Sequence, residues 1–355
     1  MYPALAVHQA LDYRIDASLW VGSQNGLEQD ILASYQIDFV GIPGGGVHGM
    51  RLSQLPRNVI ELLRGYKHAR SIVREFKPDV IFYTGGYIGV PMALAARNIP
   101  SVVFIPDVEP GLALNVIIRT ADMIAMSTDQ TEKFIKKSQN AHVSGYPIRK
   151  ELKKWSRQSA REFFGIGTEE KVLLVFGGSK GARSINDALF SQLVPLTKEM
   201  HVIHITGKSN WDSASEKVAS IKLSNPENYH AYPFLDHEMG AAFAAADLVV
   251  CRAGASTIGE LPYFGLPAIL VPYPHAWRYQ HQNAEHLVSH GGAILLKDED
   301  LPHNLSTQIT DLMCDQSKLS KMRDDMRALA VENAAELMAE MIFEAGSRQM
   351  RGSGK

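Results

Sequence analysis

Short apolar runs rich in β-branched residues alternate along the chain with amphipathic segments of helical period, and this alternation constrains the fold more than any other feature. It is typical of parallel α/β architecture, in which helices connect the strands of one sheet. In the first half of the chain it predicts helices at 2–11, 58–76, 89–97 and 128–136, and strands at 18–21, 37–42, 80–83, 101–105, 123–126 and 142–144.

A second domain is expected after the Pro-containing segment Gly145-Tyr146-Pro147-Ile148-Arg149, which leads into a charged stretch at 150–157. A chain of 355 residues is long enough for two domains. We predict domains over 1–149 and 150–329 and a helical stretch at 318–343. A terminal helix at about 330–345, which overlaps the end of this stretch, is expected to pack back on the first domain. Strands of the second domain are expected at 171–176, 201–206, 248–252, 268–272 and 293–296. Two doubly wound domains in tandem favour a ligand bound between them, beyond the carboxyl ends of the strands.

The bulk composition excludes several classes of protein. Lys and Arg number 36 against 38 Asp and Glu, so nothing favours a nucleic-acid partner. The two cysteines, Cys251 and Cys314, are too few for a disulfide framework or a cysteine-based metal site, which fits a reducing cytoplasm. No apolar run reaches the length of about 18 residues that crosses a bilayer, so any membrane contact is expected to be peripheral.

The most informative motif joins a predicted strand to a predicted helix through small residues, Cys251-Arg252-Ala253-Gly254-Ala255-Ser256-Thr257. Gly254 permits close approach of a ligand, and amides at residues 255–257 with the helix dipole favour a diphosphate. Glu260, one turn further along, is placed to accept hydrogen bonds from both hydroxyls of a ribose. The alternative is a capped helix whose glutamate faces solvent.

A dense polar cluster follows the next predicted strand. It contains His275, Arg278, Gln280, His281, Gln282 and Asn283. Amide side chains at the carboxyl end of a strand suit sugar hydroxyls, because each offers both a donor and an acceptor.

These motifs, taken together and in order, resemble the MurG family of peptidoglycan synthesis, which belongs to the GT-B glycosyltransferases. The resemblance covers nearly the whole chain. Besides the motif around Gly254 with Glu260, it rests on Gly85-Gly86-Tyr87, the segment 145–149, Gly177-Gly178-Ser179-Lys180-Gly181-Ala182-Arg183, and Gln280 with Asn283-Ala284.

The resemblance implies an inverting transfer of N-acetylglucosamine from UDP-GlcNAc to the muramyl 4-hydroxyl of lipid I. It implies that Glu260 holds the ribose, that Ala255, Ser256, Thr257 and Ser179 contact the diphosphate region, and that Gln280 reads the sugar hydroxyls. A backbone group at Leu235 would read uracil. Arg149 and Asn115 would contribute from the linker and first domain, and Arg252, Gly254 and Asn283 complete the expected binding set. No essential metal or other cofactor is expected.

The chain departs from the family at its start. The family begins with a strand and a glycine-rich loop ending in His, directly before the segment matching residues 2–7; here they are absent, which would leave a gap in the first sheet and remove a favoured general base. Asp107 or Glu109, where the family has a His-Glu-Gln-Asn run, could supply a carboxylate base. The alternative is a turn whose acids are solvated. His48 in Gly44-Gly45-Gly46-Val47-His48-Gly49 is a further candidate base.

Other signals are weaker. The glycines at 44–49 lack the acid that a nicotinamide site needs, and Asp298-Glu299-Asp300 reads as solvated acids at a helix start rather than a metal site. The predicted helix 58–76 carries Ile60, Leu63 and Tyr66 on one side among basic residues. Such a helix can lie on anionic lipid, here the cytoplasmic face of the cell membrane. The alternative is a stripe that faces the core.

Three other functions fit the same pattern. One is a glycosyltransferase of the same fold with another acceptor, and a second is a UDP-GlcNAc 2-epimerase. The third is a UDP-sugar-binding protein that has lost catalysis together with its first loop.

Overall fold

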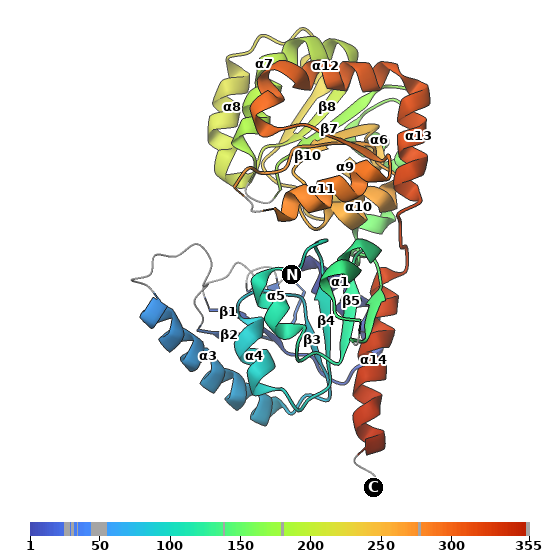
Figure 1. Ribbon diagram of the computed structural model, residues 1–355. Helices are drawn as coiled ribbons and strands as arrows, with labels where there is room; N and C mark the ends of the chain where they lie inside the picture. The colour runs from blue at the N-terminus through green and yellow to red at the C-terminus, as the bar shows by residue number, and fades with distance from the viewer. Residues whose placement is uncertain are drawn as a thin grey trace. The chain divides into compact units, whose positions relative to one another are not determined.

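The computed structural model describes residues 1–24, 29, 32–33, 35–43, 55–137, 139–178, 181–275 and 278–352, with backbone alone at 13, 55–60 and 348–352. The chain forms two compact units, one from Met1–Pro147 with Asn333–Lys355 and one from Ile148–Glu332 (Figure 1). The first boundary lies two residues before the one expected from the sequence. Among the described residues, no helix is both long and apolar enough to cross a membrane.

The strands of unit 1 form two parallel sheets instead of one. The first sheet pairs β1 (Trp20–Ser23) with β2 (Phe39–Ile42). The second has the order β3 (Ile81–Tyr83), β4 (Ser101–Ile105), β5 (Met123–Met126) and β6 (Ala141–Val143). In the described part of the chain no strand pair joins these two sheets.

The helices of unit 1 largely follow the sequence pattern. They are α1 (Tyr2–Leu11), α3 (Leu55–Phe76), α4 (Gly89–Ala95), α5 (Leu112–Ile117) and α14 (Ala334–Gly352), which contacts α1 and β4. Two expectations were wrong. The segment 128–136 forms a 3₁₀-helix, Asp129–Phe134, whose amino end is capped by the Thr128 side chain. The terminal helical stretch is broken between α13 (Gln316–Arg327) and α14, because the chain crosses there from unit 2 to unit 1.

Unit 2 is a doubly wound domain around one six-stranded parallel sheet. The strands are β7 (Val172–Phe176), β8 (His201–Ile205), β9 (Tyr229–Tyr232), β10 (Leu248–Cys251), β11 (Ala268–Leu270) and β12 (Ala293–Leu295), in the order β12-β11-β10-β7-β8-β9. The helices are α6 (Arg157–Phe164), α7 (Arg183–Glu199), α8 (Trp211–Ala219), α9 (Met239–Ala245), α10 (Thr257–Phe264), α11 (Tyr279–Ser289), α12 (Leu301–Cys314) and α13. The sequence pattern missed β9, because this half-buried edge strand has no apolar run.

A buried ion pair anchors the amino ends of the central strands. Arg161 on α6 is almost fully buried and donates to the carbonyls of Gly167, Thr168 and Glu170, each at 2.7 Å. Its other terminal nitrogen lies 3.0 Å from Asp247, just before β10, which also accepts from the amide of Val172 in β7. Helix α6 is thereby tied to both neighbouring strands.

Replacing Arg161 by Met is expected to destabilise unit 2 by about 3 kcal/mol, because Asp247 and three carbonyls lose a buried donor. Urea denaturation measures the change. The matched control is Arg157→Met, since Arg157 also pairs with Asp247 but its side chain is 48% exposed. That variant should lose less than about 1 kcal/mol. Equal stability of the Arg161→Met variant and the parent chain would contradict this account.

Candidate functional site

The strand order of unit 2 has its switch point between β7 and β10. The chain adds strands on one side of β7 and, later, on the opposite side of β10. The connections that leave the carboxyl ends of these two neighbouring strands therefore run in opposite directions, which is where open α/β sheets bind ligands. The two glycine-containing motifs found in the sequence are those two connections.

The turn after β7 is built on close backbone packing. A Cβ on Gly177 would lie 2.1 Å from the amide nitrogen of Ala182, and one on Gly181 would lie 2.2 Å from the carbonyl oxygen of Thr206. Gly181 also has a φ of +73°, which L residues rarely adopt. Larger residues at either position would distort the turn. Ser179, the expected diphosphate contact, lies outside the described residues.

The turn after β10 opens onto free space. A Cβ on Gly254 would meet no atom within 4 Å, so a ligand can approach the backbone there. The amide of Thr257 already donates to the carbonyl of Gly254 at 3.0 Å, as does its hydroxyl at 2.6 Å. Of the three amides expected to face a diphosphate, only those of Ala255 and Ser256 therefore lack an acceptor among the described residues.

Glu260 is partly buried, so it is not the fully solvated glutamate of the alternative. Burial of this carboxyl raises its pKa to about 7, against the opposing effects of a hydrogen bond from Ser256 and the charge of Arg149. A carboxyl whose pKa is shifted close to 7 at the switch point of such a sheet is typical of a functional site. It can exist in both protonation states at the pH of a cell.

Arg149 and Leu235 lie in the same unit as Glu260. The buried Arg149 donates to the carboxylate of Asp236 at 2.7 Å and to its backbone carbonyl at 3.4 Å. Leu235, also buried, directly precedes Asp236. The linker arginine thus fixes the turn that was expected to read uracil.

The guanidinium of Arg252, a residue of the expected binding set, makes several hydrogen bonds within the protein. It donates to the carbonyls of Val271 and Pro272 at 3.1 and 3.4 Å, to Asp298 at 2.5 Å and to the Ser184 hydroxyl at 2.8 Å. The reading of Asp298 as a solvated acid was therefore wrong. These bonds join the connections that follow β7, β10, β11 and β12.

Two amide residues of the polar cluster also support this edge. The fully buried Asn283 donates to the carbonyl of Ala253 at 3.2 Å, which braces the turn after β10. Gln280 accepts from the amide of Tyr273 at 2.8 Å through its side-chain oxygen. Sequence reasoning missed Ser184 and Asp236 as supports, because contacts between distant segments leave no local pattern.

The candidate residues of unit 1 gather at the turn after β4. Glu109 is buried, so the expectation of solvated acids was wrong for it, and Asp107 is partly buried. Asn115 donates to the carbonyl of Pro110 at 3.1 Å and so holds this turn. His48 lies outside the described residues.

The predicted membrane helix is α3. Its Leu63 side chain is 58% exposed, which contradicts a stripe that faces the core at this position, and Tyr66 is half-buried. The side chain of Ile60 lies outside the described residues.

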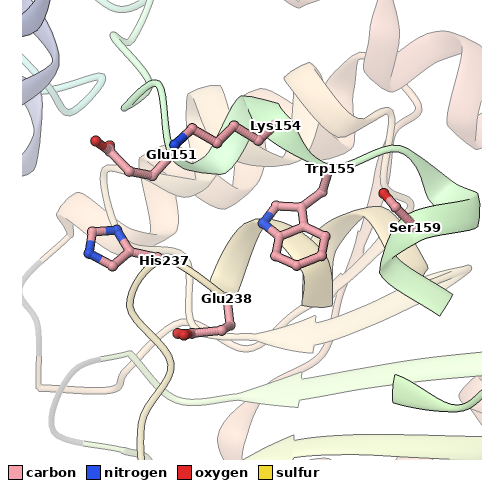
Figure 2. Close-up of a pocket in the computed structure, with 6 residues that line it drawn as sticks. All are labelled: Glu151, Lys154, Trp155, Ser159, His237 and Glu238. Carbon is pink, nitrogen blue, oxygen red and sulfur yellow. The ribbon is translucent and has the colours of Figure 1, made fainter. Parts of the chain in front are cut away.

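Unit 2 has a further cavity of about 510 Å³, which sequence reasoning did not anticipate. Figure 2 shows Trp155 and His237 among its lining residues; the others are Glu151, Lys154, Ser159 and Glu238. The cavity shares the linker and the turn after Leu235 with the candidate site, but it includes neither glycine turn. In the described residues, no group of three or more His, Cys, Asp or Glu side chains is placed to hold a metal ion.

Comparisons with known proteins point to one family. The model of the glycosyltransferase family 28 N-terminal domain matches residues 1–126, and that of the C-terminal domain matches residues 172–340. The UDP-N-acetylglucosamine–N-acetylmuramyl-(pentapeptide) pyrophosphoryl-undecaprenol N-acetylglucosamine transferase of Halalkalibacterium halodurans is 35% identical, over 97% of this chain and 96% of its own length.

Solved structures agree with this assignment. MurG of Acinetobacter baumannii has a TM-score of 0.75 and 26% identity, over 97% of this chain and 95% of its own. The UDP-GlcNAc 2-epimerase of Neisseria meningitidis, with a TM-score of 0.67 and 13% identity over 97% and 96%, shares the fold alone. The chain has the GT-B fold and belongs to glycosyltransferase family 28.

Proposed function

We propose that this enzyme transfers N-acetylglucosamine from UDP-GlcNAc to the muramyl 4-hydroxyl of lipid I, with inversion at the anomeric carbon. The observation that carries the proposal is Glu260, a carboxyl of raised pKa on the helix that follows the turn after β10, at the switch point of unit 2. The H. halodurans relative, named for this transfer over nearly its whole length, supports the choice of substrates.

The donor would lie along the carboxyl edge of unit 2. The amides of Ala255 and Ser256, with the dipole of α10, suit the diphosphate, and Glu260 accepts hydrogen bonds from the two ribose hydroxyls. A backbone group at Leu235 reads the uracil, and Gln280 reaches the sugar. Arg252 and Asn283 act indirectly, because they hold the loops on which these groups stand.

The reaction is a displacement at the anomeric carbon. The acceptor oxygen forms a bond to this carbon while the bond to the UDP oxygen breaks, and the proton of the hydroxyl passes to a base. UDP leaves with the bonding electrons, and the amides at the turn after β10 stabilise its charge. Asp107 and the buried Glu109 are the carboxylates of unit 1 that we propose for the base. No metal takes part in this scheme.

A lipid-linked acceptor requires the enzyme to reach the membrane. The exposed Leu63 lies on α3 among the exposed basic side chains of Arg64, Lys67 and Arg70. Apolar insertion combined with attraction to anionic lipid gives peripheral binding, here to the cytoplasmic face of the cell membrane.

Transfer of labelled N-acetylglucosamine from UDP-GlcNAc to a lipid I analogue tests the function. Glu260→Ala is expected to lower kcat/KM by about 100-fold or more, because the charged hydrogen bonds to the ribose are lost. Glu285→Ala, an exposed glutamate on α11, is the matched control and should keep full activity. Binding of UDP-GlcNAc without any product would instead identify a sugar-nucleotide-binding protein without catalysis.

Donor affinity should depend on pH through Glu260. Ribose hydroxyls favour the ionised carboxylate, so UDP is expected to bind more tightly as pH rises from 6 to 8, across the pKa of about 7. Calorimetric titration at several pH values measures this dependence. In the Glu260→Gln variant the affinity for UDP should be weak and nearly independent of pH. If the variant kept the same pH dependence as the parent chain, the role assigned to Glu260 would be wrong.

The same group makes the ligand-free enzyme less stable. Its pKa is higher in the folded than in the unfolded state, so its contribution to stability is present at low pH and is lost as pH rises through 7. Glu260→Gln should therefore raise the free energy of unfolding at pH 8 by roughly 2 kcal/mol, and by less at pH 5. Urea denaturation at both pH values checks the sign, and a destabilised variant at pH 8 would contradict it.

A further inference from the structure

In their described residues, the two turns at the switch point offer a diphosphate neutral amides and the dipole of a helix. Arg252, the basic residue within the second turn, donates to four internal acceptors. Because this guanidinium is engaged within the protein, other basic side chains on this edge of unit 2 are better placed to balance the charge of the diphosphate.

Several other basic side chains near this edge are already paired with carboxylates. The pairs are Arg149 with Asp236 at 2.7 Å, Arg183 with Asp187 at 3.7 Å, and Lys297 with Glu299 at 3.7 Å. Pairing with a carboxylate reduces the attraction of each group for a second anion.

Lys208, directly after β8, is placed differently. Its ammonium lies 4.7 Å from the centroid of the Phe234 ring, and none of the carboxylates in the described ranges pairs with it. The face of an aromatic ring holds an exposed ammonium by only about 0.5–1 kcal/mol. The group therefore keeps its ability to donate hydrogen bonds to an anion.

The backbone places Lys208 beside the first glycine turn. The residue follows Gly207, whose Cα would be 3.1 Å from a Cβ on Gly181, and Asn210 in the same short helix touches that position at 2.4 Å. Its aromatic partner, Phe234, directly precedes Leu235. Lys208 thus spans from the glycine turn to the segment proposed to read the base.

We propose that Lys208 binds the diphosphate of the donor nucleotide, with its aliphatic stem held by the Phe234 ring. The assignment rests on the nucleotide-sugar site of the proposed function and adds a side-chain cation to it. An ammonium on a flexible stem offers three donors. It also stabilises the negative charge that grows on UDP as the bond to the sugar breaks.

Binding of UDP and of uridine to the full chain, measured by calorimetry, tests the proposal. Lys208→Met keeps a stem on Phe234 and removes the charge. It should raise the Kd of UDP by about 10- to 100-fold while the Kd of uridine changes by less than about twofold, because uridine has no phosphate. Lys208→Arg should restore most of the affinity for UDP.

Lys217→Met is the matched control. The Lys217 ammonium also lies over a ring, that of Phe190 at 5.5 Å, but it pairs with Asp187 at 2.6 Å. This variant should bind UDP like the parent chain.

Three results would overturn the assignment. An unchanged Kd for UDP in Lys208→Met would show that the ammonium does not reach the diphosphate. Equal weakening of UDP and uridine would show that Lys208 supports the base or the fold. A parent chain that binds neither ligand would refute the proposed function, and this assignment with it.

Discussion

Close contact between backbone segments at Gly177 and Gly181 is the constraint on which the candidate site depends. The carbonyl of Thr206 and the amide of Ala182 occupy the space where side chains at these positions would stand. The connections after β7 and β8 can therefore lie against each other, and α7 starts directly above the switch point. The Arg252 guanidinium extends the same rigidity to the connections after β10, β11 and β12. The loops at the carboxyl edge of the unit 2 sheet are thus held in place by backbone packing and by the hydrogen bonds of Arg252.

Charges in unit 2 divide into two groups with different consequences. Arg161 and Arg252 are buried with acceptors for most of their donors, so they stabilise the fold and hold other segments in place. Glu260 and Lys208 have fewer partners of this kind within the protein, and both are proposed to bind the donor nucleotide. Groups of the second kind cost stability or contribute little to it. Such groups are kept at binding sites because they contribute to binding the ligand, even though they do not contribute to the stability of the free protein.

Local patterns in the sequence predicted much of this architecture. In both places a strand leads through a glycine turn directly into a helix, so β7 with α7 and β10 with α10 were predicted from the local sequence pattern. Contacts across the sheet were not predictable in this way. Arg252 and Asp298 are 46 positions apart, and no pattern at either indicates that one will neutralise the other. The edge strand β9 and the buried state of Glu109 depend on neighbours in space in the same manner. The expected roles of Leu235 in reading uracil and of Arg149 in the binding site came from the family resemblance, because the residue types alone do not indicate them.

Unit 1 is assembled from both ends of the chain, with unit 2 inserted between residues 147 and 333. Helix α14 contacts α1 and β4, although more than two hundred residues separate it from either. On the ribosome, the contiguous unit 2 can complete its sheet as soon as its own residues emerge. Unit 1 cannot be completed until α14 has been synthesised, because α14 covers surfaces of α1 and β4 that stay exposed until then. The half of the enzyme that is made first is therefore the half that finishes folding last.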